Sequence, residues 1–159
     1  MQNIYIDAAT TMGAIGVCAK DTNVIRVGAT VYSMDKADNN SEYERYAKEY
    51  DIHFIFDDIP VLNFFAVPQV DVFALDSDGG FIGTVGQQTD FESDAAICYI
   101  SKTRETFFIA DNGKSFIEIA DSWKNELKPY DKIVFYKSKE EAKKNIEIVE
   151  MPDIEFPLL

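Results

Sequence analysis

Two clusters of carboxylates are the residues of this sequence best suited to do chemistry. The first cluster is Asp76-x-Asp78, which lies between two apolar runs and is followed by Gly79 and Gly80; the second consists of Asp90, Glu92 and Asp94. Carboxylates at such spacings can bind a metal ion, act as a general acid and a general base, or form turns and carry surface charge. The surrounding residues discriminate between these roles.

Calcium binding is the first possibility for Asp76-x-Asp78. An EF-hand loop that began at Asp76 would need an oxygen ligand at its fifth position, glycine at its sixth and glutamate at its twelfth. This chain has Gly80, Phe81 and Gln87 at those positions. The loop also lies between predicted strands, whereas an EF-hand joins two helices. The sequence therefore predicts neither a metal site nor a cofactor site.

Catalysis is the second possibility. Asp76 and Asp78 could serve as acid and base only if burial gave their two carboxyl groups different pKa values. In a glycine-flanked turn we expect both to contact solvent, because aspartate is favoured there for its hydrogen bonds to nearby backbone N–H groups. The single histidine, His53, lies in a strand-like run, and Cys18 and Cys98 are best explained as free, buried thiols. No catalytic set remains, so we expect the protein not to be an enzyme.

The placement of charge favours a protein partner. The formal net charge is −13, and residues 51–100 contain no Lys or Arg, whereas ten of the fifteen basic residues fall between Lys102 and Lys144. An acidic surface repels phosphate backbones and attracts basic proteins, so we expect no nucleic-acid partner and a basic protein partner. The alternative is a solvated surface that serves solubility alone. The nine acids of the segment are Asp51, Asp57, Asp58, Asp71, Asp76, Asp78, Asp90, Glu92 and Asp94.

Length and hydropathy suggest a cytoplasmic protein of one domain. The 159 residues are enough for a single hydrophobic core, so we expect one domain over 1–159. No basic region precedes the first apolar residues, Ile4-Tyr5-Ile6, and no apolar run approaches the roughly 20 residues that a membrane helix needs. We therefore expect a cytoplasmic location and no membrane partner.

Short strands dominate the predicted elements. Residues 70–75 and 81–85 should form a hairpin around the Asp-Gly turn, and residues 95–100 and 106–110 should form another. Further strands are predicted over 4–6, 14–19, 24–32, 52–56 and 133–136, and the tail from Ile146 to Leu159 is expected to be an edge strand or a loose arm.

Capping boxes predict three helices, which begin at Ser41, Ser115 and Ser138 and have Glu44, Glu118 and Glu141 three residues later. The first helix carries an apolar stripe of Tyr43, Tyr46, Ala47 and Tyr50, and the second places Trp123 in its core-facing stripe. Consecutive strands followed by helices predict an α+β fold with a mainly antiparallel sheet and helices packed against it.

The segments "VPQVDVFALDSDGGFIGTVG" and "AAICYISKTRETFFIADNGKSFIEIADSW" resemble the central part of SMI1/KNR4-type domains of the SUKH superfamily. In that family an apolar strand ends in an Asp-x-x-Gly-type turn, a second strand and a strand pair follow, and a phenylalanine-led helix closes the unit. The resemblance covers about residues 60–127. The residues that carry it are Phe73, Asp76, Gly79, Gly80, Tyr99, Ile109, Phe116 and Trp123.

The resemblance implies a non-enzymatic binding protein. Many bacterial members of the family resemble immunity proteins that neutralise a cognate toxin, often a nuclease or a deaminase, and fungal relatives are associated with cell-wall regulation. Combined with the charge placement, it predicts that an acidic surface docks a basic protein such as a toxin. A regulatory interaction module without a toxin partner and an unrecognised enzyme are the alternatives. The predicted partner-binding residues are Asp76, Asp78, Asp90, Glu92 and Asp94.

Overall fold

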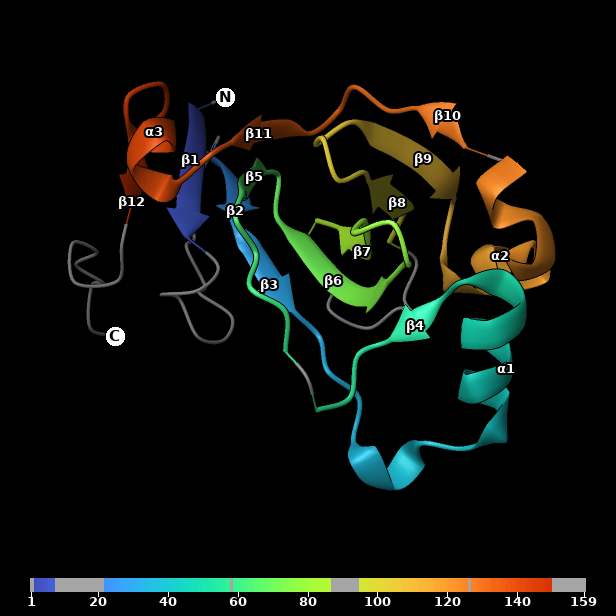
Figure 1. The fold of residues 1–159 in the computed structure, drawn as a ribbon. Coiled ribbons are helices and arrows are strands. Elements are labelled where there is room, and N and C mark those ends of the chain that lie inside the picture. Colours follow the sequence, from blue (N-terminus) through green and yellow to red (C-terminus); the bar gives the residue numbers. More distant parts are fainter. Residues whose placement is uncertain (1, 8–21, 58, 87–94, 126, 150–159) are drawn as a thin grey trace.

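The computed structural model describes residues 2–7, 22–57, 59–86, 95–125 and 127–149. Within these residues the fold is α+β with a mainly antiparallel main sheet, as the sequence predicts. The strands follow the order β10-β9-β8-β7-β6-β3, with β4 also paired to β6 (Figure 1). The strand bounds are β3 Ala29–Val31, β4 His53–Phe54, β6 Val70–Leu75, β7 Phe81–Val85, β8 Ile97–Ile100, β9 Thr106–Ala110 and β10 Lys128–Pro129.

The two predicted hairpins are confirmed. β6 pairs with β7 antiparallel and β8 with β9 antiparallel, and β7 joins the two hairpins by pairing with β8. The predicted strand over 24–32 is present as two pieces, because the chain breaks at Gly28, which has a φ of 116°. Its second piece, β3, pairs parallel to β6. This is the exception to the antiparallel pattern in the described part of the main sheet.

Both faces of the main sheet are buried. One face packs Phe73, Ile82 and Tyr99 against helices, and the opposite face packs Val72, Phe81, Cys98 and Ile100 against irregular chain. Strand residues therefore alternate between two cores, as the period of two requires. Cys98 is a free, buried thiol, as predicted, and burial raises its pKa to about 12. Cys18 lies outside the described residues.

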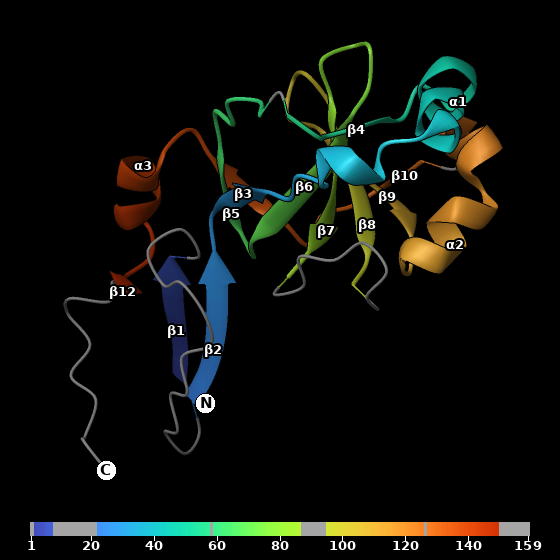
Figure 2. The same ribbon diagram turned by 90° about the horizontal axis from the view of Figure 1, so that it is seen from below.

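The helices that cover the first face are α1 Ser41–Tyr50, α2 Gly113–Glu118 and the 3₁₀ helix η2 Ala120–Asn125. Figures 1 and 2 show α1 and α2 side by side at one end of the molecule. Tyr43, Tyr46 and Tyr50 of α1 pack on this core, and Trp123 of η2 is 1% exposed, so both predicted stripes face the core. No helix among the described residues is both long and apolar enough to cross a membrane.

Smaller sheets complete the fold at the other end of the molecule. β1 Gln2–Asp7 pairs parallel with β2 Thr22–Val27 and with β12 Ile148–Val149, so part of the predicted C-terminal arm is an edge strand. β5 Phe65–Val67 pairs antiparallel with β11 Val134–Tyr136. The helix α3 Lys139–Lys143 follows β11. The predicted strand over 14–19 lies outside the described residues.

Two of the three predicted N-caps are wrong in position. Asn40, not Ser41, caps α1 by accepting a hydrogen bond from the Glu42 amide, and Asn112, not Ser115, caps α2. The side chain of asparagine accepts such a bond as readily as that of serine, so the capping-box pattern placed the N-cap one residue too late in α1 and three residues too late in α2. The predicted start of the first helix at Ser41 is confirmed. The third is confirmed, because Ser138 caps α3 and accepts from the Glu141 amide.

Candidate functional site

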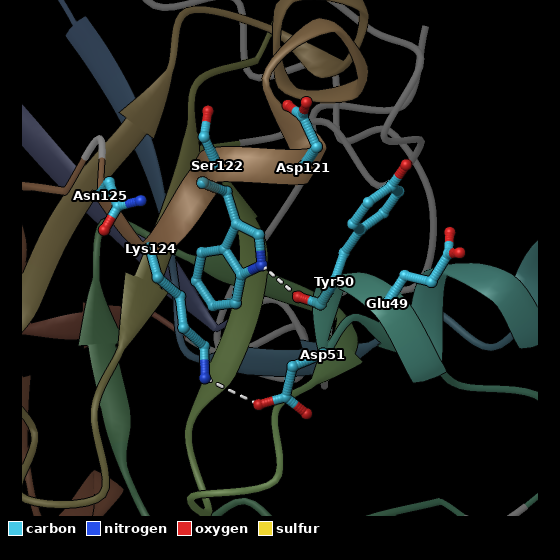
Figure 3. A pocket seen from close by; sticks show the side chains of 8 residues that line it. Glu49, Tyr50, Asp51, Asp121, Ser122, Lys124 and Asn125 are labelled. Carbon is cyan, nitrogen blue, oxygen red and sulfur yellow. Dashed lines mark hydrogen bonds and ion pairs between the residues drawn. The ribbon is translucent and has the colours of Figure 1, made fainter.

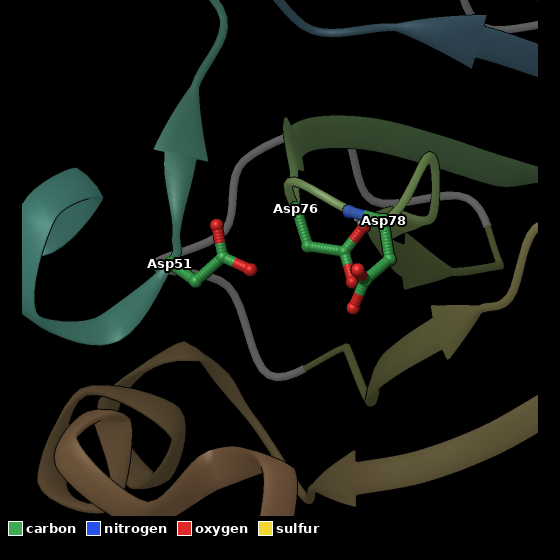
Figure 4. Close-up of side chains that lie close together, drawn as sticks. All are labelled: Asp51, Asp76 and Asp78. Carbon is green, nitrogen blue, oxygen red and sulfur yellow. Dashed lines mark hydrogen bonds between the residues drawn. The ribbon is translucent and has the colours of Figure 1, made fainter.

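Three aspartates from two separate segments meet beside the helical end of the main sheet. Asp51 follows α1, whereas Asp76 and Asp78 lie in the turn between β6 and β7 (Figure 4). Each contributes a carboxylate oxygen to a group in which these atoms lie within 4.8 Å of one another. We call these three residues the carboxylate cluster.

The end of α1 positions Asp51. The residue adopts the left-handed conformation, with φ 57° and ψ 38°, and thereby ends the helix. Aspartate tolerates this conformation better than most residues with a Cβ atom. The following strand, β4, pairs with β6 in a register that places His53 opposite Leu75. Because Leu75 directly precedes Asp76, this pairing brings the end of α1 to the turn.

Asp76 is buried, and this corrects the prediction that its side chain contacts solvent. Its side chain is fully shielded from solvent, and its Oδ1 accepts hydrogen bonds from the Gly80 amide at 2.6 Å and the Asp78 amide at 3.1 Å. The Tyr99 hydroxyl donates to Oδ2 over 2.5 Å. Burial, together with the bond to this carboxylate, raises the pKa of Tyr99. Asp76 therefore organises the turn and contributes no exposed surface of its own.

Asp51 accepts hydrogen bonds on both carboxylate oxygens. Ser77 donates its backbone amide to Oδ1 at 3.0 Å and its hydroxyl to Oδ2 at 2.7 Å, and His53 Nε2 lies 2.9 Å from Oδ1. The Lys124 ammonium donates to Oδ2 over 2.7 Å. Partial burial opposes ionisation, but the hydrogen bonds from Lys124 and Ser77 outweigh it and hold the pKa of Asp51 well below its usual range.

Lys124 of η2 is the cation of the cluster. Besides Asp51, its Nζ lies 3.8 Å from Asp76 and 3.5 Å from Asp78. Partial burial disfavours the charged ammonium, but the three carboxylates outweigh this and raise the pKa of Lys124. The neighbouring Trp123 donates its indole N–H to the Tyr50 carbonyl over 2.6 Å. η2 is thus bonded to the end of α1 through two consecutive side chains (Figure 3).

A surface pocket of about 200 Å³ lies between α1 and η2 (Figure 3). Three carboxylates line it, those of Glu49, Asp51 and Asp121, against the single ammonium of Lys124. Glu49 also pairs with Arg45 on the surface of α1, at 3.3 Å. The remaining lining residues are Tyr50, Ser122, Trp123 and Asn125.

The geometry of these polar groups differs from that of a catalytic triad. In a Ser-His-Asp triad the histidine lies between the serine and the carboxylate, because it must take the proton of the serine hydroxyl. Here Asp51 lies between the two, since Ser77 and His53 both bond to it. His53 is therefore placed to orient Asp51, and not to activate Ser77.

The predicted partner-binding residues differ in their exposure to solvent. The side chain of Asp78 is 77% exposed, whereas that of Asp76 is buried. Asp90, Glu92 and Asp94 lie outside the described residues. Although residues 51–100 contain no Lys or Arg, the carboxylate cluster has a basic neighbour in the fold, because Lys124 returns from the C-terminal part of the chain. Asp57 likewise lies 3.5 Å from Lys36.

Sequence reasoning missed Asp51, Asp121 and Lys124 as members of one site. The end of a predicted helix directly before Asp51, and the position of Lys124 beside the core residue Trp123, were the available signals. Neither signal reveals that the two segments meet. The chain matches no known family model, no curated protein and no solved structure.

Proposed function

We propose that this protein is a non-enzymatic binding domain of the SMI1/KNR4 type, and that it neutralises a basic protein toxin by docking it on an acidic surface. The surface consists of Asp78, which lies 3.5 Å from Lys124, and Asp121, which lines the pocket between α1 and η2; we call these two residues the acidic rim. We propose that Asp90, Glu92 and Asp94 also contact the toxin.

The observation that carries the proposal is the surplus of carboxylates over ammonium groups in a fixed framework. Three aspartates share Lys124, and Asp121 adds a further exposed carboxylate at the same pocket. Hydrogen bonds to the backbone and to Tyr99 hold the turn that carries Asp78. A preorganised acidic surface of this kind accelerates association with a basic partner and selects it over other proteins.

The polar groups of the site support binding better than catalysis. The carboxylates that are buried or half-buried are engaged by backbone amides, Tyr99, Ser77 and Lys124, which are structural partners. The Cys98 thiol is fully buried, and its raised pKa disfavours the thiolate that nucleophilic attack requires. The exposed acids remain available for a partner's lysine and arginine side chains.

The test is a charge reversal with a matched control. Affinity capture from cells that express the protein naturally identifies the partner, and the dissociation constant of the purified pair is then measured at several salt concentrations. For Asp78→Lys/Asp121→Lys we expect at least a tenfold weaker affinity and a shallower salt dependence. The control Glu140→Lys/Glu147→Lys changes the net charge equally on exposed residues near α3 and should bind almost as the wild type does.

A second arm addresses the acids at 90–94. Asp90→Lys/Glu92→Lys/Asp94→Lys should also weaken binding and its salt dependence, and co-expression of the wild-type protein should relieve growth inhibition by the partner. Full affinity with unchanged salt dependence in both charge-reversed variants would contradict docking through acids. A partner that binds through the acidic rim but inhibits no growth would instead point to the regulatory interaction module.

A further inference from the structure

The buried face of the sheet opposite the helices is covered in part by a segment without regular secondary structure; β5 and β11 also contribute to this core. Residues 55–57 and 59–64, here called the crossing segment, lead from β4 across this face to β5 (Figure 1). Ile55 and Phe64 at its ends are buried in this second core, and Leu62 packs partly against it. The segment thus has an inner side that is part of the core.

The outer side of the crossing segment is also apolar. Ile59 is 54% exposed and Val61 is 88% exposed, and Pro60 lies between them. Ile117 and Val134 are the other large aliphatic residues exposed among the described residues, and each stands alone in its element. Single exposed aliphatic residues are normal on protein surfaces, but a contiguous exposed apolar stretch marks an interaction surface.

The backbone of the crossing segment is held at both ends. At its start, the Ile55 amide donates to the Phe73 carbonyl over 3.0 Å, and the Met34 amide donates to the Ile55 carbonyl over 2.7 Å. At its end, the Arg104 side chain hydrogen-bonds to Asn63 and lies over the Phe64 ring at 5.2 Å. An apolar surface fixed in this way loses little conformational entropy on binding, which favours affinity.

The start of the crossing segment lies near the carboxylate cluster, because it directly follows β4. A second pocket, of about 260 Å³, is lined by residues His53 to Asp57 together with Leu75. His53 also bonds to Asp51 of the carboxylate cluster. The pocket therefore joins the cluster to the start of the crossing segment.

We propose that Ile59 and Val61 form the apolar half of the docking surface and insert into an apolar cleft of the partner that is rimmed by Lys or Arg. This inference rests on the proposed function, because the same basic protein is the occupant. A second copy of the chain fits the surface poorly, since two chains with a net charge of −13 each repel one another. A basic partner gains from the same charge.

Photo-crosslinking in cells that express the protein naturally tests the position of the surface. A benzophenone amino acid replaces Val61 in the full chain, and the matched control carries it at Val134, which is 50% exposed on β11. We expect an adduct with a basic protein from position 61 and none from position 134. No adduct, equal labelling at both positions, or an adduct with a second copy of the chain would overturn the inference.

Affinity measurement with the crosslinked protein, purified, separates this inference from the proposed function. Ile59→Ser/Val61→Ser should weaken binding at least tenfold and leave the salt dependence unchanged, whereas Val134→Ser should have little effect. If Asp78→Lys/Asp121→Lys loses binding but Ile59→Ser/Val61→Ser binds fully, the inference about Ile59 and Val61 is contradicted and the proposed function is not. If thermal unfolding shows that the double variant is destabilised, the affinity of the single variant Val61→Ser is measured instead, and the same weakening is expected.

Discussion

The indole nitrogen of Trp123 lies 2.6 Å from the backbone oxygen of Tyr50 and donates a hydrogen bond to it. Tyr50 is the last residue of α1, so its carbonyl has no partner within the helix. This bond connects the two helical elements that enclose the pocket at the acidic rim. It also places Lys124, the next residue, beside Asp51.

Replacing Trp123 by phenylalanine should lower the free energy of unfolding by about 1–3 kcal/mol, because the Tyr50 carbonyl loses its donor and the indole volume is only partly filled. Urea unfolding measures the loss. Hydrogen exchange should become faster for the last amides of α1 and stay unchanged in β6 and β7. An equal acceleration throughout the protein would argue against a local link between η2 and α1.

Replacing Lys124 by methionine should destabilise the protein at pH 7 by about 1 kcal/mol, a modest value because the side chain is 41% exposed and solvent screens its ion pairs. The lowered pKa of Asp51 contributes stability above the ordinary carboxyl pKa of about 4, and this contribution disappears as the pH falls. The difference between variant and wild type should therefore shrink below about pH 4.

Urea unfolding between pH 2.5 and pH 7 checks this dependence. The exposed Lys114 provides the control, since Lys114→Met removes an equal charge outside the carboxylate cluster. A Lys124→Met variant whose deficit stays constant over the whole pH range would show that Lys124 acts by packing on Trp123 and not by charge.

A buried carboxyl group elsewhere in the main sheet provides a further pH test. Asp71 of β6 is completely buried; Thr30 and Gln69 donate hydrogen bonds to its Oδ1, and its Oδ2 has no partner among the described residues. Burial raises the pKa of Asp71, although the hydrogen bonds from Thr30 and Gln69 and the positive charge of Arg26 oppose this. The native state therefore holds the proton to higher pH than the unfolded chain.

The stability that this proton confers is complete below about pH 4 and is lost as the pH rises towards the raised pKa. At pH 7.5 the free energy of unfolding of Asp71→Asn should therefore exceed that of the wild type by about 1–2 kcal/mol, as measured by urea unfolding. This difference in free energy should disappear near pH 4. Asp131→Asn, at an exposed acid, should leave the pH profile unchanged. Parallel profiles for Asp71→Asn and wild type would contradict burial of a proton at Asp71.

The hairpins of the main sheet could be predicted because their signals are local. β6 and β7 begin and end at the predicted residues, since alternating apolar residues and the Asp-Gly turn specify both the strands and their pairing. The core position of Trp123 follows equally from helical spacing. The N-caps were less well determined, because Asn40 and Asn112 precede serines that satisfy the same pattern.

The environment of Asp76 could not be predicted from the turn alone. Its burial depends on Tyr99, which comes from β8, and on the approach of η2, and both contacts are distant in the sequence. The same long-range packing brings Lys124 to acids that have no basic neighbour along the chain. The absence of basic residues from 51–100 therefore does not mean that the acids of this segment lack a counter-ion in the fold.

Lys124 has a consequence for the order of events during synthesis. The ribosome makes the three aspartates well before it adds this lysine, so a nascent chain that ends before residue 124 carries them without their counter-ion. The proposed docking surface therefore reaches its final form only after η2 has left the exit tunnel and has docked on the rest of the domain.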